Sequence, residues 1–272
     1  MKALPRLSPA GRRVLWLTLA ALTLLTTMLH TLALFSAMDR IGYFQRSAAP
    51  VILFYVFCAL GILVCAAFPF LIYNRDVARE PHELPTLRFV GAAVAAVAAC
   101  TTALFLIFKA SALPTPTPLN LLTALSLLCA AVYFALRLKT GNVCSTVLWG
   151  YGAILSAALS LVLTYFDRYT QMNAPHKISL HVCMLAVMFA LLAEQRDLLD
   201  RPLPRLCTAG TALAAFLCTA LSLPAIIAFI GGVYDDPLYL FFDLLTLGFA
   251  VYFGTKCAQY ARTATPTEEV SQ

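Results

Sequence analysis

The chain has 272 residues, of which 61% are hydrophobic and only 12% are charged. Soluble domains carry about 25% charged residues, so this composition excludes an ordinary soluble domain. The formal net charge is +6, but no polar stretch is long enough to form a separate basic domain, and we expect no nucleic-acid partner.

Eight apolar segments follow one another along the chain, and each is about as long as a helix that crosses the roughly 30 Å apolar core of a bilayer. They are joined by short polar loops and lack the strict two-residue alternation of barrel strands. The segments cover residues 14–38, 50–73, 88–112, 119–137, 144–166, 177–193, 206–231 and 238–260. The sequence therefore predicts an all-α, polytopic integral membrane protein with about eight transmembrane helices.

The two halves of the chain share short matches in the same order. Pro118-Leu119 precedes an Ala-Val-Tyr-Phe tetrapeptide at 131–134, and Pro237-Leu238 precedes the same tetrapeptide at 250–253, so both matches have an offset of 119 residues. This order predicts a duplicated unit. We expect two parallel four-helix repeats, residues 1–140 and 141–260, followed by a disordered cytoplasmic tail at 261–272.

Basic residues are divided unequally between the loops on the two sides of the predicted membrane. If the N-terminus is cytoplasmic, 14 of the 19 Lys and Arg lie on the cytoplasmic side and 5 lie outside. Because basic residues concentrate in cytoplasmic loops, we expect a cell-membrane protein with both termini in the cytoplasm. The loops at 39–49, 113–118, 167–176 and 232–237 are then expected outside.

Ionisable side chains inside a predicted span are costly, so each is a candidate for a binding site. Asp243, Lys109, His30 and His181 all fall in the predicted outer half of the membrane, which suggests a polar site that binds substrate from outside. Asp243 and Lys109 correspond to alanines in the opposite half, and we expect them to form a pair between the repeats. Three of these residues also have a structural interpretation: Lys109 and His181 can reach the interface, and His30 can be bonded as a neutral imidazole within the bundle.

Charged residues at the predicted cytoplasmic ends of the helices are interpreted as exposed pairs of little energetic value. Glu194, Arg196, Asp197, Asp200 and Arg201 form the densest group. The nine cysteines show no metal-binding spacing, so we expect neither a metal nor another cofactor. Catalytic motifs such as HExxH and GxSxG are absent from the sequence, and we do not expect an enzyme.

Three classes of function remain from the sequence. The first is a small-solute transporter with a polar site in the outer half of the bilayer, between the repeats. The alternative is a membrane-embedded sensor or an accessory subunit of a larger complex, without transport or catalysis of its own. An intramembrane enzyme is the third. The expected partners are the lipid bilayer, a small solute, and a membrane protein or a second copy of the chain.

Overall fold

A computed structural model describes residues 9–39, 42–45, 47–72, 85–138, 143–168, 170–171, 173–199 and 203–262. Its helices are α1 (Pro9–Ser36), α2 (Ala49–Ile72), α3 (Pro85–Lys109), α4 (Thr117–Leu136), α5 (Val143–Tyr165), α6 (Pro175–Leu198), α7 (Pro204–Ile230) and α8 (Pro237–Arg262). All eight are long and apolar enough to cross a membrane. The predicted all-helical class is confirmed, and the eight apolar helices indicate a multi-pass membrane protein.

Proline marks the start of most helices. Five of them begin at a proline, namely α1, α3, α6, α7 and α8. Proline suits this position because its fixed φ is helical and the amide hydrogen that it lacks has no intrahelical acceptor there. The helix boundaries therefore follow local sequence signals as well as the length of the apolar runs.

The end of α6 differs from the prediction. The sequence suggested a span ending at 193, before Glu194, but α6 continues to Leu198. Glu194 and Gln195 are 3% and 2% exposed and belong to the buried face of this helix. The expectation was incorrect because the first charged residue was taken as the end of the apolar segment.

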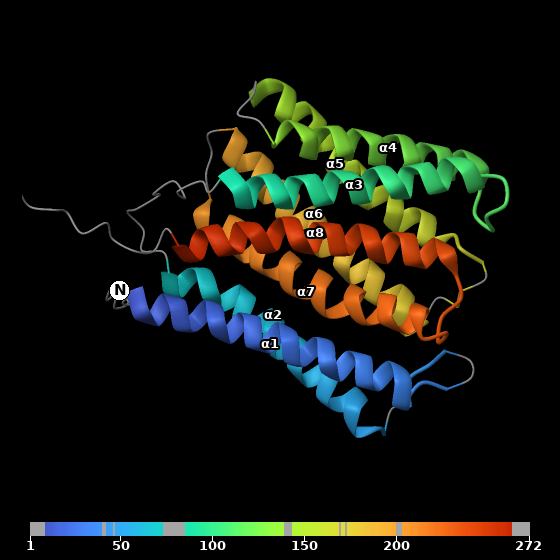
Figure 1. The fold of residues 1–272 in the computed structure, drawn as a ribbon, viewed down its shortest axis with the longest axis horizontal. Helices are drawn as coiled ribbons and strands as arrows, with labels where there is room; N and C mark the ends of the chain where they lie inside the picture. Colours follow the sequence, from blue (N-terminus) through green and yellow to red (C-terminus); the bar gives the residue numbers. More distant parts are fainter. Residues whose placement is uncertain are drawn as a thin grey trace, which may run out of the picture.

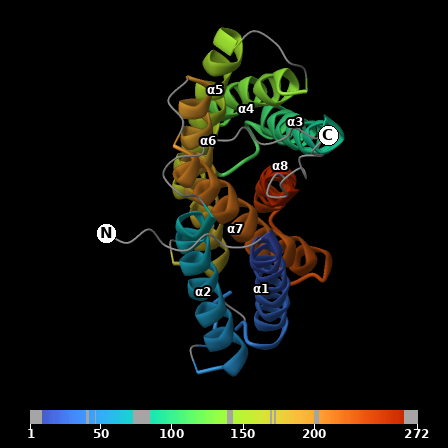
Figure 2. The ribbon, with the colours of Figure 1, turned by 90° about the vertical axis from the view of Figure 1, so that its left-hand side faces the viewer.

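Helices α3 to α8 form a closed ring of six. Each helix packs against the next one along the chain, and α8 packs against α3 to close the ring (Figure 2). The α1–α2 hairpin lies outside the ring and packs mainly against α7 (Figure 1). Across the ring α6 and α8 also touch, so the interior is narrow.

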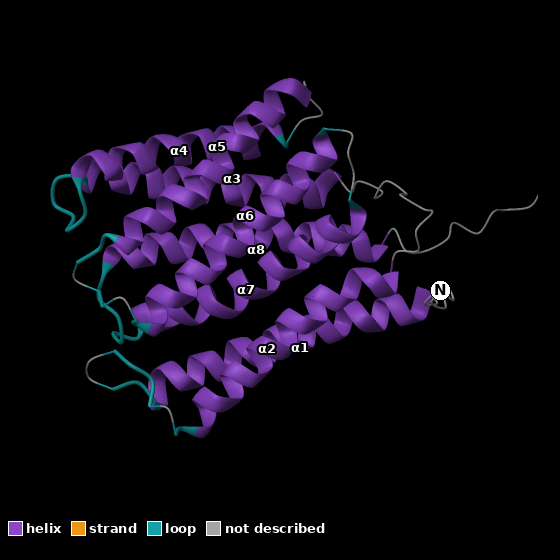
Figure 3. Ribbon diagram, turned by 180° about the vertical axis from the view of Figure 1, so that it is seen from behind, coloured by secondary structure: helices purple, strands orange, loops and turns teal. Residues whose placement is uncertain are grey.

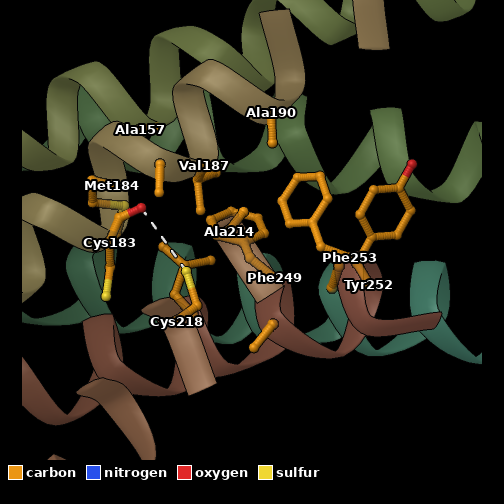
Figure 4. Packing of buried hydrophobic residues seen from close by; sticks show 14 of the residues in the cluster. Ala157, Cys183, Met184, Val187, Ala190, Ala214, Cys218, Phe249, Tyr252 and Phe253 are labelled. Carbon is orange, nitrogen blue, oxygen red and sulfur yellow. Dashed lines mark hydrogen bonds between the residues drawn. The ribbon is translucent and has the colours of Figure 1, made fainter. Parts of the chain in front are cut away.

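Apolar side chains fill the middle of the ring. Phe134 of α4 reaches across to Phe249 and Tyr252 of α8, with ring centroids 5.6 and 4.8 Å apart, although these two helices are not neighbours. Val187 and Ala190 of α6 pack against the same region (Figure 4). The central part of the bundle is therefore a packed core.

Both ends of the described chain lie at one end of the bundle. The loops that join α1 to α2, α3 to α4, α5 to α6 and α7 to α8 gather at the opposite end, and the described residues between helices are loops (Figures 1 and 3). From the distribution of basic residues along the sequence, we expect these loops outside the cell. This end is called the predicted outer end below, and the opposite one is the predicted inner end.

The packing of the two halves is not equivalent. In the second half α6 packs against α7, whereas α2 and α3 make no contact among the described residues. The hairpin α1–α2 packs on α7, whereas its expected counterpart α5–α6 does not pack on α3. The parallel repeat therefore stays a prediction from the sequence. Its expected boundary at 140 and the tail from 263 onward lie outside the described residues.

Candidate functional site

Asp243 is buried in α8 and is paired with a residue that was not expected. Its carboxylate oxygen Oδ2 lies 2.7 Å from Nε2 of His176, in the first turn of α6. Asp243 is 3% exposed. The expected partner, Lys109, is exposed at the end of α3. The expected pair is therefore not formed. The helix α6 begins two residues earlier than predicted, and this places His176 beside the first turns of α8.

Further polar residues surround this ion pair at the predicted outer end. The ring of His176 lies between Tyr234 and Tyr239, with centroids 4.4 and 4.9 Å away. The Tyr239 hydroxyl donates a hydrogen bond of 3.0 Å to Oδ2 of Asp167, just beyond the end of α5. We call Asp167, His176, Tyr234, Tyr239 and Asp243 the outer cluster. It joins the end of α5, the start of α6 and the start of α8.

Lys177 fixes the end of α5 beside the outer cluster. Its side chain is fully buried, and Nζ donates to the backbone carbonyls of Asp167 and Thr170, both at 3.2 Å, and of Tyr165 at 3.5 Å. An ammonium group at the C-terminus of a helix satisfies carbonyls that have no intrahelical donor and interacts favourably with the helix dipole. Lys177 therefore has a structural explanation.

Two histidines that the sequence proposed for the site connect helices elsewhere. His30 of α1 places Nδ1 3.1 Å from the carbonyl oxygen of Ala220 in α7, and its ring stacks on Phe54 of α2 at 4.3 Å. His181 of α6 places Nε2 2.9 Å from the Thr164 hydroxyl of α5. Of the four candidate residues, the structure brings only Asp243 into the outer cluster.

A second buried carboxylate lies at the predicted inner end. Oε1 of Glu194 accepts from Nη2 of Arg137 at 2.8 Å, from Nζ of Lys256 at 2.6 Å and from the Tyr252 hydroxyl at 2.7 Å. The Lys256 ammonium also lies 4.8 Å from the centre of the Tyr252 ring. The sequence interpretation of Glu194 as a member of exposed pairs was wrong, since this side chain is 3% exposed.

The groups around Glu194 come from corresponding positions of the two halves. Tyr133 and Arg137 of α4 have an offset of 119 residues from Tyr252 and Lys256 of α8. A spacing of four residues places each tyrosine and its cation on one helix face. The sequence thus held a signal that the earlier interpretation missed: the repeated tetrapeptide carries a basic residue three positions after its end. We call Tyr133, Arg137, Glu194, Tyr252 and Lys256 the inner cluster.

The two clusters lie toward opposite ends of one helix pair. Asp243 and Lys256 are 13 residues apart on α8, which corresponds to about 20 Å along a helix. Both clusters connect α6 to α8, by the hydrogen-bonded pair His176–Asp243 in one and by the ion pair Glu194–Lys256 in the other. The apolar core shown in Figure 4 lies between them. The ring is consequently closed by charged side chains toward each end and by apolar packing in its middle.

An apolar groove of about 450 Å³ lies on another part of the molecule's helix surface, and none of the residues of the two clusters lines it. It is formed by α1, α7 and α8, and Trp16, Phe216 and Cys257 contribute to its walls. Within the part of the chain that the structure describes, no group of three or more His, Cys, Asp or Glu side chains is arranged to hold a metal ion.

Comparisons of the chain with protein-family models, with curated proteins and with solved structures found no match. The functional interpretation therefore depends on the geometry of the helix ring and of its two charged clusters.

Proposed function

We propose that the protein is a transporter for a small solute, and that the solute passes along the axis of the ring formed by α3 to α8. The observation that carries this proposal is the presence of a buried cluster of ionisable side chains toward each end of one ring. Charges within membrane-spanning segments are costly and are retained mainly where they have a function. Two such clusters in the same ring are consistent with two closures of one path.

The contacts of α6 and α8 suggest how the closures work. At the predicted outer end these helices are joined by His176 and Asp243, and at the predicted inner end by Glu194 and Lys256. Breaking one contact while the other persists would open the ring to one side only. Alternation of the two states gives the access that a transporter requires, with rocking of helices around a central site.

Cysteine accessibility tests this proposal without knowledge of the solute. The nine native cysteines are replaced, and a single cysteine is introduced by Val187→Cys or Ser222→Cys, at buried positions between the clusters. A small, charged thiol reagent is applied to right-side-out and to inverted membrane vesicles. We expect both cysteines to react from both sides, since each closure opens part of the time.

Exposed and buried positions serve as controls for the labelling. Asn173→Cys, in the exposed loop before α6, is expected to react from one side only. Ala103→Cys, fully buried on α3, reports on general loosening of the bundle. Protection of Val187→Cys and Ser222→Cys from both sides, with Asn173→Cys reactive, would contradict transport through the ring.

The dense apolar packing between the clusters favours a second candidate, a membrane-embedded sensor or an accessory subunit. In that case the clusters hold α6 and α8 together permanently, and the partner is another membrane protein or a second copy of the chain. The same labelling experiment separates the two functions, because a permanently closed ring protects its interior from both sides.

A further inference from the structure

The inner cluster carries more positive than negative charge. Arg137 and Lys256 both form their ion pair with the same oxygen, Oε1 of Glu194. Their side chains are 17% and 16% exposed, so both cations are largely removed from solvent. Asp197, one turn further along α6, is exposed. Burying two cations against one carboxylate leaves a positive charge that calls for an anion.

Two buried donors of the cluster point to the same conclusion, whereas a buried acceptor, Oε2 of Glu194, does not. The Tyr133 hydroxyl, Nε of Arg137 and Oε2 of Glu194 have no hydrogen-bond partner within the described part of the chain, although all three are buried. Tyr133 is fully buried, and its hydroxyl lies close to the Glu194 carboxylate without the geometry of a full hydrogen bond. Two of the three atoms are donors, and buried donors are normally paired.

The neighbouring Gln195 adds an amide with the same property. Neither its nitrogen nor its oxygen has a partner among the described residues, and its side chain is 2% exposed. It fits beside Gly150 of α5, where an added Cβ would collide with the amide. The glycine therefore makes room for a buried polar group that no protein atom of the described chain satisfies.

We propose that the inner cluster is a binding site for a small oxyanion, either an organic carboxylate or an inorganic anion such as phosphate. The Tyr133 hydroxyl and Nε of Arg137 donate to the oxygens of the anion, and Lys256 balances its charge. A guanidinium group favours oxyanions because its fixed donors match two oxygens at once. This inference rests on the proposed function for one point only, namely that the bound anion is also the transported solute.

Thermal unfolding of the full-length protein in a non-ionic detergent tests the site. Unfolding is followed by tryptophan fluorescence while acetate, benzoate, nitrate or phosphate replaces chloride, which is not an oxyanion, at constant ionic strength. At least one probe is expected to raise the midpoint in a saturable manner, because a ligand that binds the folded state stabilises it. The absence of any saturable increase would overturn the proposal.

Two conservative substitutions locate the effect. Tyr133→Phe removes only the unpaired hydroxyl, and Arg137→Lys keeps the charge but removes the Nε donor. Each is expected to weaken the apparent affinity roughly tenfold, as the loss of a hydrogen bond to a charged group does. Tyr55→Phe, which removes the hydroxyl of an exposed side chain on α2, outside the ring, should leave the affinity unchanged. An affinity that Tyr133→Phe does not alter would also overturn the proposal.

The labelling experiment distinguishes failure of this inference from failure of the proposed function. Reactive cysteines between the clusters without any anion effect would retain transport and overturn the anion site. A saturable anion effect that depends on Tyr133, with both cysteines protected, would support the site and contradict transport. If phosphate and nitrate act but the carboxylates do not, the anion is inorganic.

Discussion

At the scale of single residues, charge alone did not identify the partner of Asp243. The sequence offered Lys109 because both residues lack a charged counterpart in the opposite half. The structure places the lysine at an exposed position and joins Asp243 to His176 at 2.7 Å. A pair between distant helices depends on where each helix begins and on how it is rotated, and neither is visible from composition. His176 was assigned to the polar loop at 167–176 and therefore was not considered as a partner of Asp243.

Removal of Asp243 should be harmful mainly because of His176. We expect Asp243→Ala to lower the free energy of unfolding by about 1–3 kcal/mol, since it leaves a buried donor without its acceptor. The double variant with His176→Ala should lose less than the sum of the single changes, because the residues are in direct contact. Reversible unfolding in mixed micelles measures the free energies of unfolding of the single variants and of the double variant. Lys109→Ala provides the control: its effect should add to that of Asp243→Ala, and strong coupling between 109 and 243 would contradict the pairing seen here.

The carboxyl group of Asp236, in the turn before α8, should make stability depend on pH. Burial raises the pKa of Asp236 above its ordinary value, although its Oδ1 accepts a hydrogen bond from the amide of Leu238. A raised pKa means that the folded state favours the protonated form of Asp236. Its stabilising contribution is therefore present when the pH is below the pKa of the unfolded state, and it is lost as the pH rises through the pKa of the folded state. Asp236→Asn should therefore be more stable than the native protein at pH 7 and no more stable at pH 3. Melting temperatures of the variant and of the native protein, measured between pH 3 and pH 7, test this prediction. A difference between the two melting temperatures that grows toward acid pH would contradict a raised pKa of Asp236.

At the scale of helices, local signals determined most boundaries. The length of the apolar runs places seven of the eight predicted starts, and seven of the eight predicted ends, within three residues of the observed ones. The exceptions are the start of α1, which lies at Pro9 and not at residue 14, and the end of α6. The end of α6 was missed because its last buried turn contains Glu194 and Gln195. A carboxylate is accepted inside a helix bundle when other helices supply its partners, and these partners lie on α4 and α8.

Close approach of helices requires small residues at particular positions. Gly248 of α8 faces α3, where an added Cβ would lie 2.6 Å from the Cβ of Ala98, whereas an added Cβ at Gly254 meets no atom within 4 Å. We expect Gly248→Ala to lower the melting temperature, because α3 and α8 must separate and the ring must loosen. Gly254→Ala on the same helix should be neutral or slightly stabilising, since alanine favours the helix. Equal effects of the two changes would contradict the tight contact between α3 and α8.

At the scale of the whole molecule, the even number of helices places both described ends of the chain on one side of the bundle (Figure 1). The direction of insertion is a prediction from the basic residues. In a cysteine-free background, Ser47→Cys and Asn173→Cys should react with an impermeant maleimide applied to intact cells, and Thr86→Cys should not. All three positions are exposed, so burial does not explain a difference. Labelling of Thr86→Cys alone would show that the orientation is the opposite of the predicted one.

Composition and periodicity by themselves determined the helical class, the eight apolar helices and most of their limits, because a bilayer imposes a length on each helix and requires its backbone bonds to be internal. The sequence also contained the corresponding residue pairs Tyr133–Arg137 and Tyr252–Lys256. Only the tertiary structure decided that α3 to α8 close into a ring, that α1 and α2 stay outside it, and that Glu194 joins the two corresponding pairs. The physical reason is that the lipid-facing positions and most of the buried positions are both apolar in this chain. The sequence pattern therefore does not predict which helices pack against each other. Helix packing depends on shape complementarity and on a few buried charges between distant segments.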